Sequence, residues 1–154
     1  MSADTVFSNN LLSCFDGFTA RETLQWMCDE RLGHGMSREV FRFAPDRDFV
    51  IKFELVEGHF QNVKEMETWR QVEHTESARW FAPCHSISGN GRVLLQRYAR
   101  PISVSELPTE VPRFFTDLKP GNWGFYGKQP VAVDYGLNLL MGRGITKALK
   151  KAQW

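Results

Sequence analysis

The sequence has few cysteines, almost no net charge and no long apolar run, and each shortage excludes a class of protein. The three cysteines, Cys14, Cys28 and Cys84, are an odd number without C-x-x-C spacing, which argues against a disulfide framework and a zinc site. With 19 Lys and Arg against 18 Asp and Glu, no net field draws the chain to nucleic acid or an anionic membrane. No stretch approaches the roughly 18 apolar residues of a membrane span, and no basic flank leads into an apolar run. We therefore predict a cytoplasmic protein with reduced thiols and with neither nucleic acid nor membrane as a partner.

The composition fits one globular domain that spans residues 1–154. Hydrophobic residues make up 42% of the chain and aromatic residues 13%, which is enough for a sizeable core. We find no internal repeat and no low-complexity linker.

Local patterns predict a mixture of short strands and helices. Thr19 followed by Glu22 is typical of a capping box and predicts a helix over Thr19–Glu30. Strands are expected in short runs that are rich in Val, Phe and Ile and are separated by turn residues. Hairpins are expected where two such runs flank Ser88-Gly-Asn-Gly or Gly127-Lys-Gln-Pro. The expected strands are Glu39–Phe43, Phe49–Phe53, Trp80–Ile87, Arg92–Tyr98, Trp123–Tyr126 and Val131–Val133; the further expected helices are Asn62–His74 and a basic one over Thr146–Trp154; Ala99–Pro112 is expected to be a connector.

The first two chemical signals lie before and within the expected strands. Gly33 and Gly35 belong to the string Leu-Gly-His-Gly-Met-Ser-Arg-Glu-Val, which ends at Val40, and glycines without a Cβ let backbone amides approach phosphate oxygens. A plain turn is the alternative interpretation. Lys52 ends the string Val50-Ile-Lys inside an apolar strand, where a lysine that points to solvent is the alternative.

The other two signals come later and are more specific. Asp117-Leu-Lys-Pro-Gly-Asn places an aspartate five residues before Asn122, with Lys119 between them. Twelve residues after Asn122 comes Asp134-Tyr-Gly.

In this order the four signals resemble the protein-kinase superfamily, over roughly residues 31–136. Asp117 to Asn122 matches the H-R-D-L-x-x-x-N loop from its aspartate onward, and Asp134-Tyr-Gly resembles D-F-G. The loop is also similar to that of aminoglycoside and choline kinases. The resemblance implies an α+β, kinase-like fold with an antiparallel N-lobe sheet, one αC-type helix and a minimal C-lobe. Residues 1–30 would then be an N-terminal extension with a helix, residues 31–98 the N-lobe and residues 99–154 the reduced C-lobe.

The resemblance also implies a role for each matched residue, with ATP and Mg²⁺ as cofactors. Lys52 would bind the phosphates and Glu65 would orient it, because Glu65, unlike Glu67, shares a helix face with Trp69 and Val72. Asp117 would orient or deprotonate the substrate hydroxyl, and Lys119 would neutralise charge on the transferred group. The remaining assignments are Asn122 and Asp134 as metal ligands, and Gly33, Gly35, Val40, Gln96 and Tyr98 as nucleotide contacts, with Gln96-Arg-Tyr-Ala at the hinge.

The chain departs from the family in ways that bear on function. Arg38 replaces the third loop glycine, and Phe115-Thr116 stand where His-Arg would precede the aspartate. About twenty residues separate the hinge from Asp117, so the long helix of the second lobe is missing. The N-terminal helix, the tail or a partner protein or second copy must then cover the exposed faces, and we expect an apolar set to pack there: Leu139, Leu140, Met141 and Trp154.

Two functions remain open from the sequence. One is a minimal ATP- and Mg²⁺-dependent phosphotransferase that acts on a hydroxyl of a protein or a small molecule. The other is a pseudokinase that binds nucleotide, captures a partner protein, or does both, since bound nucleotide can stabilise a fold without catalysis. So short a chain resembles those of compact viral genomes, and our hypothesis is a phage protein that acts in the host cytoplasm.

Overall fold

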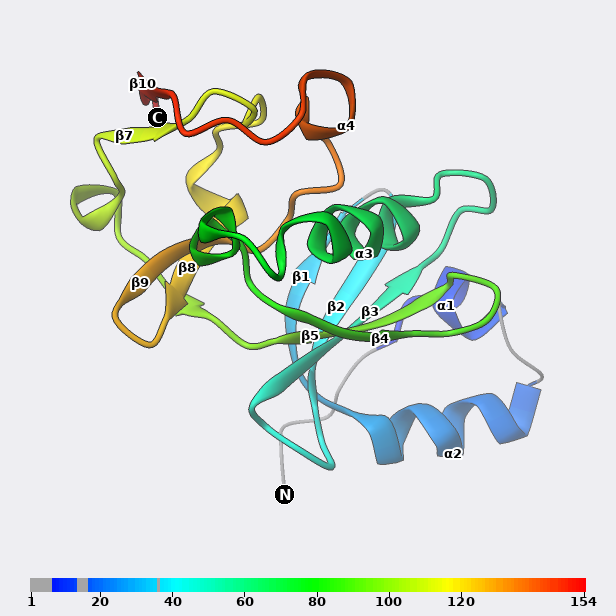
Figure 1. Cartoon of the computed structure of the whole chain (residues 1–154). Helices are drawn as coiled ribbons and strands as arrows, with labels where there is room; N and C mark the ends of the chain where they lie inside the picture. The colour runs from blue at the N-terminus through cyan, green and yellow to red at the C-terminus, as the bar shows by residue number, and fades with distance from the viewer. Residues whose placement is uncertain (1–6, 14–16, 36) are drawn as a thin grey trace. The chain divides into compact units, whose positions relative to one another are not determined.

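The structure is a computed structural model that describes residues 7–13, 17–35 and 37–154. Figure 1 shows a mixed α+β chain in which the paired strands run antiparallel, which confirms the predicted class. Internal contacts divide it into two compact units, one of Met1–Asn62 with His85–Tyr98 and the other of Val63–Cys84 with Ala99–Trp154. We call these unit 1 and unit 2.

Unit 1 is built on a five-stranded sheet with the order β1-β2-β3-β5-β4. The predicted strands over Glu39–Phe43 and Phe49–Phe53 are confirmed as β2 and β3. The predicted hairpin around Ser88-Gly-Asn-Gly is confirmed as β4 and β5, but its first strand begins at Cys84 and not at Trp80, which ends a short helix. Gly91 closes that turn by donating to the Ser88 carbonyl oxygen at 2.9 Å, with a φ of 76° that favours glycine. The bounds are β1 Cys28–His34, β2 Arg38–Phe43, β3 Phe49–Glu54, β4 Cys84–Ile87 and β5 Val93–Arg97.

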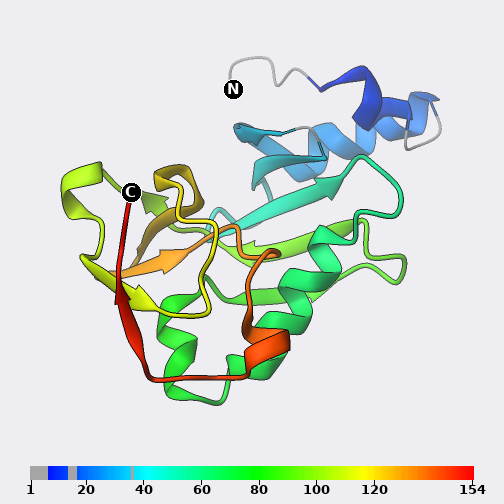
Figure 2. The same cartoon turned by 90° about the horizontal axis from the view of Figure 1, so that it is seen from above.

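Two N-terminal helices cover the apolar face of this sheet. Helix α1 (Asn9–Ser13) buries Leu11, and α2 (Gly17–Met27) buries Leu24. Figures 1 and 2 show both helices on the same side of the sheet. The core between them consists of Leu11, Leu24, Cys28, Phe41, Ile51 and Phe53. In the opening segment, Leu11 belongs to this core and Leu12 packs against it, while Cys14, Phe15 and the side chain of Phe18 lie outside the described part of the chain.

The predicted helix over Thr19–Glu30 is placed wrongly at both ends. It begins at Gly17 and ends at Met27, and the next residues form β1. Pairing with β2, with Cys28 opposite Phe43, gives these backbone groups ladder partners while Cys28 still reaches the core. The helical spacing of Leu24, Met27 and Cys28 was therefore compatible with either structure.

Helix α3 (Gln61–Val72) begins in unit 1 and continues into unit 2, and it confirms the predicted amphipathic helix. The carboxylate of Glu54 caps its start, accepting the backbone N–H groups of Gln61 at 3.0 Å and Asn62 at 3.2 Å. Glu65, Met66 and Val72 form part of its buried side, whereas Glu67 is exposed as predicted.

Unit 2 contains a second confirmed hairpin, in which β8 and β9 pair through a turn at Gly127. On its other side β8 pairs with β6, and there Gly124 is required, because a Cβ at this position would lie 2.8 Å from the Arg100 carbonyl oxygen. The bounds are β6 Arg100–Pro101, β8 Trp123–Tyr126 and β9 Gln129–Ala132, with short helices η1 Glu76–Trp80, η2 Val104–Glu106, η3 Pro120–Asn122 and α4 Leu140–Arg143.

Two further predictions fail in unit 2, and they fail together. The tail is a strand, β10 (Leu149–Lys151), rather than a basic helix, and it pairs with β7 (Glu110–Pro112) inside the expected connector. Backbone pairing and the Lys150 ammonium, which donates to the Phe115 carbonyl oxygen, tie the tail down. A tail with so few apolar residues would form a helix without an apolar face to bury, and such a short helix is marginally stable. Pairing with β7 gives its backbone N–H and C=O groups hydrogen-bond partners instead.

An aromatic core holds unit 2 together, and the tail contributes to it. Trp154 lies edge-on to Trp123, with ring centroids 5.3 Å apart, and its Nε1 donates to the Pro108 carbonyl oxygen at 2.9 Å. Leu140 is buried as well, so the expected packing is confirmed for Trp154 and Leu140. Leu139 is only half-buried, and the side chain of Met141 lies outside the described residues. Across the described ranges, none of the helices is long and apolar enough to cross a membrane.

Candidate functional site

The loop that carries Asp117 folds back on its own side chains. Asn122 donates from Nδ2 to the Asp117 carboxylate at 3.0 Å, and the Lys119 ammonium lies 3.1 Å from the same carboxylate. The loop turns through η3, where the Asn122 N–H donates to the Lys119 carbonyl oxygen at 2.9 Å. The proline at the first position of η3 pre-sets the turn. The structure therefore brings Asp117, Lys119 and Asn122 together, at the spacing the sequence indicated.

A backbone hydrogen bond joins this loop to the segment that carries Asp134. The N–H of Val133, just beyond β9, donates to the Asn122 carbonyl oxygen at 2.8 Å. Asp134 is the next residue and its side chain is exposed, whereas Tyr135 after it is buried. Unit 2 thus places two carboxylates and an amide on two segments held side by side.

Glu65 is fully buried in α3, and its Oε1 accepts the backbone N–H of Tyr135 at 3.2 Å. The choice of Glu65 over Glu67 as the buried carboxylate is confirmed by their exposure. The expected pairing of Glu65 with Lys52 joins residues of different units and stays a prediction.

In unit 1, one face of the sheet carries the residues assigned to the nucleotide. Lys52 is 3% exposed and lies opposite Val40 on β2 and opposite Leu94 on β5. Since side chains alternate along a strand, Val50 shares the face of Lys52. Val50 in turn lies opposite Gln96, which is also buried. A strand lysine that points to solvent, the alternative for Lys52, is excluded by this burial.

The two loop glycines occupy different environments. Gly33 lies inside β1, paired with Val40, and a Cβ there would make only ordinary contact with that valine at 3.9 Å. Gly35 lies at the turn into β2, where its N–H donates to the Arg38 carbonyl oxygen at 2.9 Å. Arg38 itself is buried, and it donates from Nη1 to the Asn62 side-chain oxygen at 3.2 Å. The residue that stands at the third glycine position is therefore part of the packing of unit 1.

At the predicted hinge, Tyr98 is engaged within unit 1. Its N–H donates to the Asp48 carbonyl oxygen at 2.8 Å, and the Arg42 guanidinium lies 3.2 Å from the centre of its ring. A base bound at this segment would have to use backbone groups other than this N–H.

Sequence reasoning missed three residues that shape these surroundings. Val50 was detectable from strand alternation with Lys52. Asn62 and the hydroxyl of Tyr135 had no sequence signal, because their partners are carbonyl groups distant in sequence.

The donor set at Asn122 and Asp134 fits a hard cation. The side chain of Asn122 bonds to Asp117 through its amide nitrogen, so the side-chain oxygen remains an acceptor. Within the described ranges, no group of three or more His, Cys, Asp or Glu side chains is arranged to hold a metal ion. Mg²⁺ commonly uses only one or two protein carboxylates together with substrate phosphates, and the pair meets that requirement.

Comparison with the models of known protein families, with curated proteins and with solved structures finds no match for this chain.

Proposed function

We propose that the chain is a minimal kinase-like phosphotransferase that binds ATP with Mg²⁺ and transfers a phosphoryl group to a hydroxyl of a protein or a small molecule. The observation that carries this proposal is the hydrogen-bonded loop of unit 2. Asp117 and Asn122 share a side-chain hydrogen bond of 3.0 Å, and the Asn122 carbonyl oxygen holds the backbone beside Asp134 at 2.8 Å. Phosphoryl transfer needs few groups, but they must be fixed in place, and such a loop supplies that.

The sheet face of unit 1 supports the nucleotide part of the proposal. Val40 and Lys52 are cross-strand neighbours, so an apolar surface for a base lies beside a buried cation. A lysine is expensive to bury unless its charge serves a partner or a ligand. We propose that Lys52 binds the phosphates and that Glu65 is the carboxylate that orients it.

The loop side chains then have distinct tasks. Asp117 accepts a hydrogen bond from the substrate hydroxyl and orients it for attack. The Lys119 side chain is exposed, and its flexible four-carbon stem lets the ammonium leave Asp117 and follow the transferred group. Asn122 and Asp134 would hold Mg²⁺, and when bound, that ion would neutralise charge on the phosphates.

One observation favours a second function, a pseudokinase that binds nucleotide without efficient transfer. The Asp117 carboxylate already accepts a hydrogen bond from Asn122 and forms an ion pair with Lys119. A substrate hydroxyl would need the same carboxylate oxygens. If Lys119 stays on Asp117, the loop serves as a nucleotide-dependent structural element and the outer surface captures a partner protein.

The first experiment measures the thermal midpoint with and without millimolar ATP and Mg²⁺. At a hundredfold excess over the dissociation constant, ligand binding adds about 2.7 kcal/mol, a shift of several degrees. We expect this shift in the wild-type chain and in Lys128→Ala, an exposed turn lysine, and its loss in Lys52→Ala and Asp134→Asn. A thermal midpoint of the wild-type chain that does not change when ATP and Mg²⁺ are added would contradict the proposal.

A second experiment separates the two functions. Phosphate release from γ-labelled ATP, and labelling of the chain itself, are measured for the wild type and for Asp117→Asn. Turnover that falls at least about a hundredfold in Asp117→Asn, with an unchanged thermal shift, favours the phosphotransferase. Equal and negligible turnover in both, with the shift retained, favours the pseudokinase.

A further inference from the structure

The side chain of Tyr135 is held at its hydroxyl as well as at its ring. The hydroxyl donates to the Ala82 carbonyl oxygen at 2.8 Å and lies 3.0 Å from the Cys84 sulfur, and the residue is 1% exposed. A hydroxyl has one proton, so with that proton on Ala82 the Cys84 thiol is the donor in the second contact. The ring packs edge-on against Phe81, with centroids 4.9 Å apart. A phenylalanine would keep the ring contact but leave the Ala82 oxygen buried without this donor.

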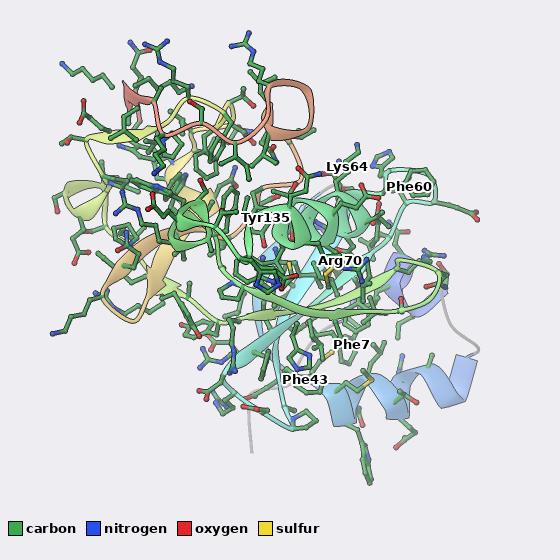
Figure 3. All side chains as sticks on the ribbon, viewed as in Figure 1. Phe7, Phe43, Phe60, Lys64, Arg70 and Tyr135 are labelled. Atoms are coloured by element: carbon green, nitrogen blue, oxygen red, sulfur yellow. The ribbon has the colours of Figure 1, made fainter. Side chains whose placement is uncertain are left out.

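The backbone of Tyr135 is fixed on both sides by hydrogen bonds to side chains. Glu65 accepts its N–H at 3.2 Å, and Asn138 donates from Nδ2 to its carbonyl oxygen at 2.6 Å. The same Asn138 amide donates to the Thr68 hydroxyl at 3.2 Å. Glu65 and Thr68 are three residues apart on α3, so they lie on one face of the helix. Figure 3, in which Tyr135 is labelled, shows it beside this helix.

Asp134 therefore lies between two attachment points that share one residue. On its N-terminal side, the Ala132 carbonyl oxygen accepts the Ala82 N–H at 2.9 Å. On its C-terminal side, the Tyr135 hydroxyl donates to the Ala82 carbonyl oxygen at 2.8 Å. The backbone around an exposed carboxylate is thus tied twice to Ala82, and this leaves Asp134 little freedom to turn away.

We infer that Tyr135 is a positioning residue whose hydroxyl fixes the turn that carries Asp134 and so sets the metal affinity of the site. This inference rests on the proposed function, in which Asp134 is a metal ligand. Partners one step removed from a ligand commonly change metal affinity by about 10–100-fold when they are mutated. The sequence Asp-Tyr-Gly is then a more rigid form of the turn than Asp-Phe-Gly would be.

The test compares three variants with the wild-type chain. Tyr135→Phe removes the hydroxyl, and Cys84→Ala removes the thiol, with its contact to that hydroxyl, while the bond to Ala82 remains. Thr75→Ala is the matched control, because it removes the N-cap of η1 in the same unit, where the Thr75 hydroxyl accepts the Ser77 N–H at 3.2 Å, without touching the turn. All three are expected to fold, with thermal midpoints lowered by a few degrees.

Two readouts are taken on each protein. Hydrogen exchange of residues 131–138 reports the turn itself, and we expect it to be about tenfold faster in Tyr135→Phe than in Thr75→Ala. Mn²⁺ binding, followed by electron paramagnetic resonance with a non-hydrolysable ATP analogue, reports the site, and we expect the Mn²⁺ dissociation constant to rise about tenfold in Tyr135→Phe. Cys84→Ala should give a smaller change of the same kind in both.

The outcomes separate this inference from the proposed function. If Tyr135→Phe matches Thr75→Ala in both readouts while the wild type binds Mn²⁺, the inference is overturned and the proposed function stands. If the wild type binds no Mn²⁺ with the analogue, the proposed function and the link to metal affinity both fall. The exchange rates then still decide whether the hydroxyl fixes the turn.

Discussion

The side-chain amide of Asn62 donates to the carbonyl oxygen of Lys52 at 3.3 Å, which ties the first turn of α3 to the middle of the sheet in unit 1. The same amide donates to the Arg92 carbonyl oxygen at 3.1 Å, and its oxygen accepts from Arg38 at 3.2 Å. Asn62 is 0% exposed, and its bonds to Lys52 and Arg38 are buried, whereas the bond to Arg92 is partly buried. A buried amide with all of these partners fixes the chain around Asn62 against the strands of unit 1.

Asn62→Ala should be one of the more destabilising single changes in unit 1. It removes the Asn62 partner of the buried Arg38 guanidinium and of the Lys52 and Arg92 carbonyl oxygens, and we expect a loss of about 2–3 kcal/mol in the free energy of unfolding. The loss is measured by urea unfolding followed by circular dichroism. Glu67→Ala, an exposed position on the same helix, is the control and should stay within about 0.5 kcal/mol of the wild type. Equal losses in the two variants would contradict the role of Asn62.

The tail of the chain should stabilise unit 2 through Trp154. Its ring lies against Trp123 and its Nε1 donates to Pro108, so Trp154→Ala should cost about 2 kcal/mol and leave Trp123 more accessible to acrylamide. Trp26→Ala provides a matched control, because Trp26 is 81% exposed on α2. We expect the control to change the urea midpoint little. A stable Trp154→Ala variant with unchanged quenching of Trp123 would show that the tail is dispensable.

The parts of the fold that could be predicted from the sequence are those set by local chemistry. Strands β2 and β3 follow from their β-branched and aromatic runs, and the hairpin turns follow from their glycines. Helix α3 follows from its apolar spacing. The tail strand could not be predicted, because β10 exists only through its pairing with β7, about forty residues earlier in the chain.

In the candidate site, too, the features set by nearby residues could be predicted from the sequence, and those set by distant residues could not. The contacts among Asp117, Lys119 and Asn122 lie within one short loop, which the sequence singled out by its spacing, although the sequence did not predict the contacts themselves. The burial of Glu65 followed from helical periodicity. The bond from the Tyr135 hydroxyl to Ala82 links residues 53 positions apart, and nothing near either residue in the sequence indicates it.

The thiol of Cys28 should make the stability of the chain depend on alkaline pH. Burial, with a further contribution from the charge of Glu39, raises the pKa of this thiol to about 12. In the unfolded chain the thiol titrates near its ordinary value, at about pH 8.5–9. The folded state therefore retains a proton that the unfolded state loses between these two values.

The sign of the effect follows from that difference in bound protons. The contribution of Cys28 to stability is fully present below about pH 8.5 and falls by about 1.4 kcal/mol per pH unit as the pH rises toward 12. Cys28→Ala lacks this titration. The difference between its free energy of unfolding and that of the wild type, measured with urea, should therefore shrink between pH 8 and pH 11. Leu24→Ala removes a side chain from the same apolar core without a titrating group, and its deficit should stay constant over that range. Parallel pH profiles for the two variants would mean that Cys28 does not stay protonated in the folded protein.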